Sequence, residues 1–466
     1  MAANPDRGLL LLKAAERLEP LDAELAREAY RGAFEAALTA GRLEPRGGTR
    51  RVAEAVQAAP PAPRPSRAAD LLLDGLAVLV TEGYATGTPM LRHALTAARD
   101  KEASSEEAWR WLPFACRMAQ VVWDDESWDE LSARLIEAAR RAGALTVLPA
   151  ALAEGAAVRL AGGQLTMAAA MTREAEGAGR TTGDPVGQCG PALIAAWRGQ
   201  QAEAAALIAA ATTQMMARGE GRWLTTAAWA NAVLYNGLGR YDQALAAAEQ
   251  ASEDPGEPGL ATWALAELIE AATRTGVTDR AAGALSRLSE ATSASATDWA
   301  LGIQARSTAL LSDGGSAEQL YREAIGRLGR TRIRTELARA HLLYGEWLRR
   351  QGRHGNAREQ LRSAYEMLDM MGIAGFAERA RRELAAAGEA VRKRTIATPG
   401  ELTAQEAQIA RLATAGHSNP AISTQLYISP RTVEWHLRKV FSKLGISSRK
   451  ELRAALSDLD GVLLPA

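Results

Sequence analysis

A short motif, a glycine followed five positions later by an alanine, recurs through the middle of the chain and limits its fold more than any other feature. Successive alanines of the motif are 36, 40, 37, 36 and 40 residues apart. A period of this length is typical of one supersecondary unit stacking on the next. The pairs are Gly163/Ala168, Gly199/Ala204, Gly239/Ala244, Gly276/Ala281, Ser312/Ala317 (with serine replacing glycine) and Gly352/Ala357.

The residues around the motif favour pairs of helices. Glycine can end one helix and turn the chain, and the alanine lets the next helix pack closely against the first. A second small or aliphatic residue follows each anchor after seven positions, from Ala175 to Ala364, and Thr88 and Trp128 continue the register upstream. Residues 1–390 are rich in Ala, Leu and Arg, which favour helix. We therefore predict an all-α fold with a helical-hairpin solenoid, which resembles tetratricopeptide repeats in degenerate form.

Two stretches suggest boundaries within the chain. Residues 59–66 contain four prolines, which cannot continue a helix. Residues 391–400 form a basic stretch that ends in Pro-Gly. We predict an N-terminal helical segment at 1–66 that ends in the Pro-rich loop, the solenoid at 67–390, a basic linker at 391–400 and a small C-terminal domain at 401–460.

The C-terminal domain should contain four short helices, because four start signals follow one another between residues 402 and 456. Glycine at 416 suits the end of the first helix. The start signals are the capping box Thr403/Glu406, Ser418 ahead of Pro420, the pair Ser429-Pro430, and a second capping box Ser448/Glu451.

The third of these helices, 430–444, has two distinct faces on a helical wheel. Val433, Leu437, Val440 and Leu444 form an apolar stripe. The opposite face carries Arg431, Trp435, Arg438, Lys439 and Ser442, with Glu434 and Lys443 at its flanks. Two short helices, a tight turn and a basic third helix form the helix-turn-helix arrangement. The alternative is an ordinary helical bundle with a solvated charged face.

The same stretch resembles the DNA-binding domain of the LuxR family over about an eighth of the chain. The residues that carry the resemblance are Leu402-Thr403, Glu406, Gly416, Ser418-Asn419, Ile422, Leu426, Ile428 to Val433, His436-Leu437, Lys443 to Gly445 and Ser448-Arg449. Pro420-Ala421 and Glu434 depart from the family pattern, which usually has a charged pair at the first position and often Lys at the second.

The resemblance implies that Glu434, Trp435 and Arg438 face the bases of double-stranded DNA, and the wheel independently supports Trp435 and Arg438. Packing against a neighbouring helix or protein is the alternative role of Trp435. The phosphate-contacting candidates are Ser429, Arg431, Thr432, Lys439, Lys443, Arg449 and Lys450. Residues 391–457 carry eleven basic and four acidic side chains, a net charge of +7 within a chain whose 55 basic and 55 acidic residues balance. A basic end of this kind indicates a polyanion partner.

The chemistry of an enzyme is not apparent. No lysine follows a glycine, as a phosphate-binding loop would require, and no two histidines are spaced as a metal-binding pair. The acidic run Asp124 to Glu126 is interpreted as the first turn of a helix, and most tryptophans as core, although some could line a ligand groove. We expect no catalytic residues, no metal and no cofactor. With two scattered cysteines and no long apolar stretch, we expect a cytoplasmic protein without a membrane partner.

The combination of a helical solenoid with this C-terminal domain resembles the C-terminal half of the large ATP-binding LuxR regulators, without their ATPase module. The sequence therefore predicts a sequence-specific transcription regulator, expected to bind DNA as a homodimer paired through residues 448–456. RNA polymerase is a candidate partner, and the solenoid would bind a small-molecule or protein effector. The competing hypothesis is an interaction scaffold in which the C-terminal domain is only an anchor.

Overall fold

The computed structural model describes residues 7–44, 47–62, 67–100, 108–182, 189–254, 257–389, 404–426, 430–444, 446, 448–452 and 455–456. The chain divides into two compact units, Met1–Ala390 and Val391–Ala466. The described residues are helices and connecting turns without any strand, so the all-α prediction is confirmed. No helix among them is long and apolar enough to cross a membrane.

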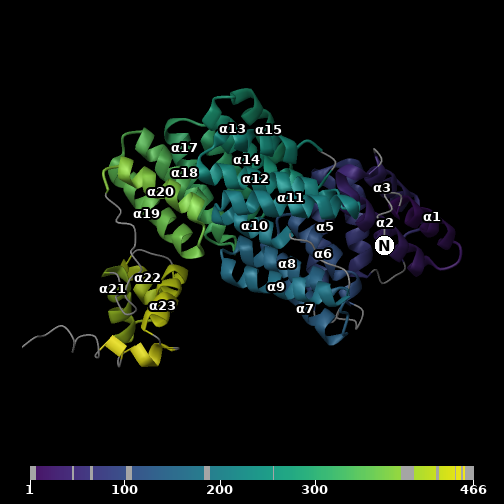
Figure 1. Cartoon of the computed structure of the whole chain (residues 1–466), viewed down its shortest axis with the longest axis horizontal. Helices are drawn as coiled ribbons and strands as arrows, with labels where there is room; N and C mark the ends of the chain where they lie inside the picture. Colours follow the sequence, from purple (N-terminus) through teal and green to yellow (C-terminus); the bar gives the residue numbers. More distant parts are fainter. Residues whose placement is uncertain are drawn as a thin grey trace, which may run out of the picture. The chain divides into compact units, whose positions relative to one another are not determined.

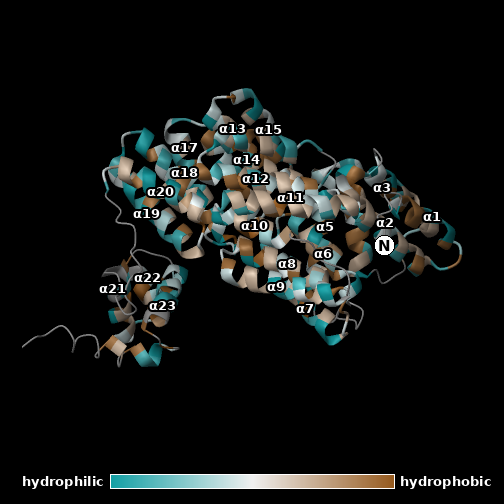
Figure 2. Ribbon diagram, in the orientation of Figure 1, coloured by the Kyte–Doolittle hydropathy of each residue, from teal (hydrophilic) through white to brown (hydrophobic). Residues whose placement is uncertain are grey.

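The first unit is built from helices that pack on their neighbours in the sequence, and Figure 1 shows α14, α12, α10 and α8 stacked through its middle. Apolar residues gather along these central helices, whereas α17 and α20 at the edge are mostly hydrophilic (Figure 2). The helices are α1 Arg7–Leu18, α2 Ala23–Ala40, α3 Gly48–Ala58, α4 Ala68–Glu82, α5 Tyr84–Arg99, α6 Leu112–Val121, α7 Asp125–Arg141, α8 Leu148–Ala161, α9 Leu165–Thr182, α10 Cys189–Arg198, α11 Gln201–Ala217, α12 Arg222–Leu238, α13 Tyr241–Ala251, α14 Leu260–Thr275, α15 Thr278–Ser295, α16 Asp298–Leu310, α17 Gly314–Leu328, α18 Arg334–Arg350, α19 His354–Met371 and α20 Ala374–Ala386.

The repeated Gly and Ala positions have the roles that their spacing predicts. All five repeat glycines have positive φ, between 72° and 78°, and each lies just after a helix. The anchors, from Ala168 to Ala357, are fully buried, and so are Thr88 and Trp128 upstream. Among the five, Gly199 lies closest to the backbone of another helix, because a Cβ there would lie 2.7 Å from the backbone nitrogen of Gly375. Glycine therefore permits both the turn and the close approach of α10 to α20.

The stack of hairpins curls until helices far apart in the sequence touch. Helix α18 packs on α8, and α20 packs on α10 and α12. The hydroxyl of Thr335 donates to the carbonyl of Ala161 at 3.0 Å, and the hydroxyl of Thr297 donates to the carbonyl of Trp123 at 2.8 Å. These bonds join residues 174 positions apart and close the superhelix around its own interior.

Buried ion pairs occupy part of this interior. Arg339 of α18 donates to both carboxylate oxygens of Glu267 in α14, at 2.5 and 2.7 Å, and to Glu270 at 2.8 Å. Arg379 of α20 binds Glu270 and Glu346, each at 2.6 Å. Burial raises the pKa of Glu270, but the charges of Arg379 and Arg339 outweigh that effect and lower the pKa below its ordinary value. The pairs hold three helices together through charge rather than apolar contact alone.

The second unit contains α21 Ala404–Thr414, α22 Asn419–Leu426 and α23 Pro430–Leu444, followed by a 3₁₀ turn, η4 Arg449–Glu451. Its core is a small apolar cluster formed by Ile409, Ala410, Ala413, Ile422, Val433, Leu437, Val440 and Leu452. Helices α21 and α22 each pack against α23, so the third helix is the one around which the domain is built.

Candidate nucleic-acid interface

Helix α23 divides into the buried and the outward faces that the wheel predicts. Val433 and Val440 are fully buried, Leu437 is almost fully buried, and Leu444 packs at the edge of the same cluster. On the other side, Arg431, Glu434 and Arg438 are exposed. The apolar stripe fixes the rotation of the helix about its axis, and this rotation leaves the charged residues on a free surface.

The connection between α21 and α22 also has the local geometry expected from its sequence. Gly416 has a φ of 92°, where only glycine is unstrained, and it ends α21. The hydroxyl of Ser418 accepts from the amide of Ala421 at 3.4 Å, ahead of the first turn that contains Pro420. Thr403, of the first capping box, and residues 427–429, of the turn before α23, lie outside the described residues.

The three residues predicted to face bases lie on consecutive turns of α23. A guanidinium nitrogen of Arg438 donates to a carboxylate oxygen of Glu434 at 2.8 Å, and their side chains are 76% and 51% exposed. Trp435 is half-buried, and its ring meets the His436 ring edge-on at 4.4 Å between centroids. The helix therefore presents an exposed acid–base pair next to an aromatic side chain.

Lys439, predicted to contact phosphate, is engaged inside the domain. Its ammonium lies 3.0 Å from a carboxylate oxygen of Glu406, which is completely buried, and 5.3 Å from the centre of the Trp435 ring. The nearby His436 is buried, which together with the Lys439 charge lowers its pKa to about 4. His436 is thus a neutral packing residue at neutral pH, and Lys439 ties α23 to α21.

Arg449, also predicted to contact phosphate, braces the α21–α22 connection. Its guanidinium donates to the side-chain oxygen of Asn419 at 2.9 Å, to the carbonyl of Ala413 at 3.4 Å and to the carbonyl of His417. Nothing in the sequence pattern pointed to these acceptors, because they lie 30 to 36 positions away.

The remaining phosphate candidates have different surroundings. Arg431 and Lys450 are exposed, Thr432 is half-buried, and Ser429 and the side chain of Lys443 lie outside the described residues. The second capping box differs from its prediction, since the Ser448 hydroxyl donates to the Glu451 carboxylate and caps no backbone amide. A 3₁₀ turn at 449–451 stands where the fourth helix was expected to begin, and the described residues after it, Leu452, Ala455 and Leu456, are helical.

The acidic run that begins at Asp124 lies at the start of a helix. Asp124 caps α7 by accepting from the amide of Ser127 at 3.0 Å, as the acidic run predicted. Within the described part of the chain, no group of three or more His, Cys, Asp or Glu side chains is placed to hold a metal ion.

Comparison with known families matches residues 400–455 to bacterial regulatory proteins of the luxR family. The chain carries a LuxR-family helix-turn-helix domain at its C-terminus. A protein of Mycobacterium bovis named as an HTH-type transcriptional regulator is 45% identical to this chain over 65 residues. A protein of Mycobacterium tuberculosis that is also named as an HTH-type transcriptional regulator is 45% identical over 65 residues. NarL of Mycobacterium tuberculosis, named as a transcriptional regulatory protein, is 38% identical over 63 residues.

These similarities are confined to the LuxR-family domain. They cover 14% of this chain, 7% of the HTH-type regulators and 29% of NarL. The outward face of α23 belongs to the matched region, whereas the hairpin stack of residues 1–390 does not.

Proposed function

We propose that this protein regulates transcription by binding a specific DNA sequence, with α23 in the major groove. The observation that carries the proposal is the orientation of α23: its apolar stripe is buried in the domain core while Arg431, Glu434 and Arg438 stand exposed on a LuxR-family domain. The major groove admits a helix and shows a distinct pattern of donors and acceptors for each base pair.

The exposed pair on α23 suits a G·C base pair. Arginine donates well to guanine O6 and N7, and a glutamate accepts from cytosine N4. Arg438 donates to Glu434 at 2.8 Å, so the two side chains lie side by side, which supports contact of both with the same base pair. Trp435 adds an apolar surface for a thymine methyl group or a sugar. Arg431 and Lys450 contact phosphates, together with Ser429, Thr432 and Lys443.

Lys439 and Arg449 have a mainly structural role in this proposal. Each is already bonded within the domain, so Lys439 contributes to phosphate binding mainly by holding α23 against α21, and Arg449 mainly by holding the α21–α22 connection. The sequence alone assigned both residues to phosphate contacts, and the proposal gives them a smaller part in those contacts. Arg431 and Lys450 keep their assignment as phosphate-contacting residues.

The proposed regulator acts as a homodimer on DNA, because a helix-turn-helix head reads half-sites that are spaced by a helical turn. Residues 448–456 supply the pairing surface by analogy with the family, and RNA polymerase is the partner that a bound regulator would contact. The stack at 67–390 is the sensor, whose effector controls whether two heads pair on DNA.

Selection of duplexes from a random pool, followed by fluorescence anisotropy over a range of salt concentrations, tests this function with the full chain. We expect one enriched motif, and a log–log slope of affinity against salt of about 0.9 per neutralised phosphate. Arg438→Ala should weaken binding to the selected site by about 1–3 kcal/mol. It should also reduce the protein's discrimination between bases at one base pair of the motif.

The control for this experiment is Arg50→Ala, which removes an exposed guanidinium on α3 that pairs with Glu54. It should leave both the affinity and the motif unchanged. If Arg438→Ala binds the selected site as well as the parent protein, the assignment of Arg438 to a base contact fails. If the full chain enriches no motif at any salt concentration, the regulator proposal fails. In that case the scaffold hypothesis becomes the better account.

A further inference from the structure

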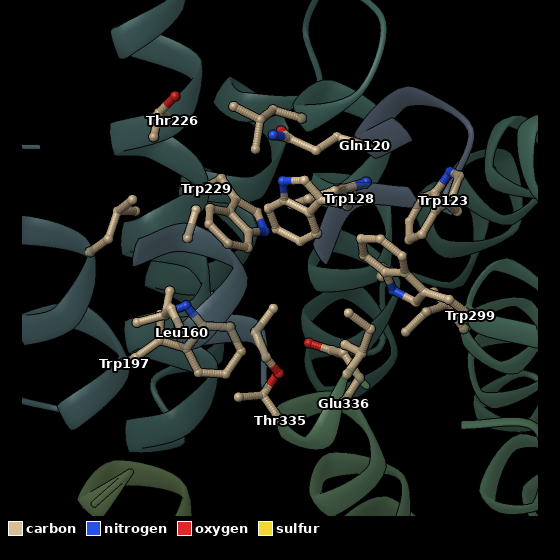
Figure 3. A pocket seen from close by; sticks show the side chains of 18 of the residues that line it. Gln120, Trp123, Trp128, Leu160, Trp197, Thr226, Trp229, Trp299, Thr335 and Glu336 are labelled. Carbon is tan, nitrogen blue, oxygen red and sulfur yellow. The ribbon is translucent and has the colours of Figure 1, made fainter. Parts of the chain in front are cut away.

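A cavity of about 170 Å³ lies inside the hairpin stack of the first unit. Its walls come mainly from one helix of each successive hairpin, α6, α8, α10, α12, α14, α16 and α18. Figure 3 shows the labelled side chains around one opening, with Gln120 and Thr226 on its upper side and Glu336 on its lower side in this view. The curling of the stack creates this space, because residues from the two ends of the series meet across it.

Indole rings form much of the wall. Trp299 lies 5.1 Å from Trp263 and 5.2 Å from Trp123, measured between ring centroids, and stacks on Trp128 at 5.9 Å. Trp229 lies 5.9 Å from Trp263 and extends the row to α12. An apolar cavity of about 150 Å³ holds a benzene ring. This wall therefore has room for one six-membered ring, and its indoles favour a flat apolar face.

The polar atoms of these rings do not take part in recognition. The ring nitrogens of Trp123, Trp197 and Trp263 are unsatisfied donors, because no acceptor among the described residues lies within reach of them. Neighbouring atoms enclose all three, so a molecule in the cavity cannot reach them either. The tryptophans thus supply apolar surface, and any recognition of charge comes from other residues on the wall.

One cation on the wall lacks a partner. Arg222, the first residue of α12, lines the cavity, is half-buried and forms no ion pair with a described residue. Burial, followed by the charge of Arg222, lowers the pKa of Arg117 in α6 to about 10, although nearby carboxylates oppose this effect. Two guanidinium groups therefore lie near each other, which favours a bound carboxylate at the one that lines the cavity.

One carboxylate on the wall is also only partly used. Glu154 of α8 is half-buried, and its Oε1 accepts from the indole of Trp128 at 2.8 Å and from the amide of Gln120. Its Oε2 accepts from no donor, and no cation forms an ion pair with it, within the part of the chain that the structure describes. Unlike the indole nitrogens, Oε2 of Glu154 and the guanidinium of Arg222 keep accessible surface.

The other two charged residues that line the cavity are already compensated. Glu267 is bound by Arg339 and Glu336 by Arg306, each at 2.5 Å. The wall therefore offers one unpaired cation and one unpaired anion. A ligand with a single charge would satisfy one of them and leave the other unpaired beside it, whereas a ligand with both charges satisfies both.

Arg222 and Glu154 lie towards the same side of the cavity. The first helices of stacked hairpins run in the same direction, and each of the two is the lining residue nearest to the start of its helix. Thr226 follows Arg222 by one helical turn, and Gln120 is bonded to Glu154. Figure 3 shows Thr226 and Gln120 on the same side of the opening, opposite Glu336. The two unpaired charges thus suit opposite charges that lie close together in one molecule.

We propose that this cavity binds a free α-amino acid with an apolar ring side chain. Its carboxylate pairs with Arg222, its ammonium pairs with Oε2 of Glu154, and its ring packs on the indoles of Trp263 and Trp299. The inference deepens the proposed sensor role of the stack and rests on it for its biological meaning. Binding itself involves only residues 120–336 and no DNA.

Isothermal titration calorimetry with three probes of similar shape tests the proposal on the full chain. L-Phenylalanine carries both charges, 3-phenylpropanoate lacks the ammonium, and 2-phenylethylamine lacks the carboxylate. We expect saturable binding of L-phenylalanine, about tenfold tighter than that of either other probe, because each of those leaves one charged group of the wall unpaired.

Two variants should lose discrimination in a crossed pattern. Arg222→Gln should bind L-phenylalanine and 2-phenylethylamine within about twofold of each other, since the carboxylate no longer has a cation. Glu154→Gln should do the same for L-phenylalanine and 3-phenylpropanoate. Each variant should keep its discrimination against the remaining probe. A general loosening of the cavity would weaken all three probes alike, so the crossed pattern separates a binding role from a structural one.

Arg218→Gln is the matched control. Arg218 follows α11, pairs with Glu220 at 2.6 Å and does not line the cavity. It lies four positions before Arg222, so its loss removes the same charge from the same region of the chain. This variant should keep both tenfold ratios.

Absence of saturable L-phenylalanine binding to the parent protein overturns the proposal, and so does a ratio below about threefold against either other probe. A discrimination that Arg222→Gln or Glu154→Gln leaves unchanged also overturns it. If a variant does not fold, as judged by circular dichroism, the comparison of the three probes on the parent protein still decides. Because the titration contains no DNA, these results leave the DNA-binding proposal untouched, and failure to select a DNA motif would leave the cavity result standing.

Discussion

The interiors of the two units differ in kind. The hairpin stack buries arginines, glutamates and tryptophans together, so that Arg339 and Arg379 link α14, α18 and α20 while the indoles surround a cavity. The LuxR-family domain has a small apolar core and, among its described residues, one buried carboxylate, Glu406, which Lys439 compensates from the edge. The larger unit buries enough surface to offset the free-energy cost of desolvating its charged side chains. The smaller unit buries much less surface and can offset that cost for few charges.

This difference separates two kinds of contribution. The DNA-binding candidates stand on an exposed helix face, where each acts through its own side chain. The interior residues of the stack act by holding helices together, through desolvated ion pairs and packed rings. Changes in the stack should therefore affect stability first, and changes on α23 should affect affinity first. The predictions below test this contrast, from the largest expected effect to the smallest.

Arg339→Met should produce the largest loss of stability. It leaves the buried carboxylates of Glu267 and Glu270 without Arg339, which costs about 3–5 kcal/mol. Hydrogen exchange measured by mass spectrometry should show faster exchange throughout residues 1–390 and unchanged protection in α21 and α23. Arg50→Met, which removes an exposed pair, should shift neither unit by more than about 1 kcal/mol. Equal losses of stability in Arg339→Met and Arg50→Met would contradict the proposed difference between buried and exposed ion pairs.

The two units should also respond differently to acid. The pKa of His436 is about 4 in the folded domain, below the value of about 6.5 for an unfolded histidine. Between pH 6.5 and pH 4, His436 is protonated in the unfolded chain and neutral in the folded domain. The domain therefore loses stability as the pH falls from 6.5 to 4. The loss should not exceed about 3 kcal/mol.

The hairpin stack should lose less stability than the domain in this first stage, because burial lowers the pKa of its His341 to a smaller extent than that of His436. Its buried Glu270 and Glu346 have lowered pKa values, so their contribution is complete above an ordinary carboxylate value of 4.5 and disappears only below it. Hydrogen exchange at pH 6.5, 5.5 and 4.5 would resolve the two units. His436→Gln should remove the pH dependence of the domain over this range. A stack that loosens first would show that the order is wrong.

Arg431 and Arg449 should separate a phosphate contact from a structural one. Arg431→Ala should reduce the salt slope of DNA binding by about 0.9 without altering the unfolding temperature of the domain. Arg449→Ala removes bonds to Asn419 and to two carbonyls, so it should destabilise the domain by about 1–2 kcal/mol and leave the salt slope unchanged at temperatures where the domain stays folded. Identical salt slopes for the two variants would remove the distinction.

Gly276→Ala should have the smallest effect of the set. The φ of 78° at this repeat glycine disfavours alanine, but no other atom lies within 4 Å of the added Cβ. The cost should be about 1 kcal/mol, from the left-handed conformation alone. Gly237→Ala provides the comparison, since its Cβ would lie 2.8 Å from the Phe376 ring and should cost more. Urea unfolding of both variants measures the difference.

The short-range features of the molecule could be predicted because their causes are local. The glycines with positive φ, the buried anchors from Ala168 to Ala357, the Ser418 cap and the apolar stripe of α23 depend on residues within about one helical turn or one hairpin. A helix needs only its caps and its 3.6-residue period to be recognised. The sequence by itself therefore determined the helical class, the hairpin register and the outward face of α23.

The long-range features were decided only by tertiary structure. Whether Thr297 reaches Trp123, and whether Arg339 meets Glu267, depends on small rotations that accumulate over several hairpins, and no single pattern records their sum. The engagement of Arg449 with Asn419 has the same origin on a smaller scale. The cavity and its three unsatisfied indole donors exist because the stack closes, so they became visible only once distant helices had been placed side by side.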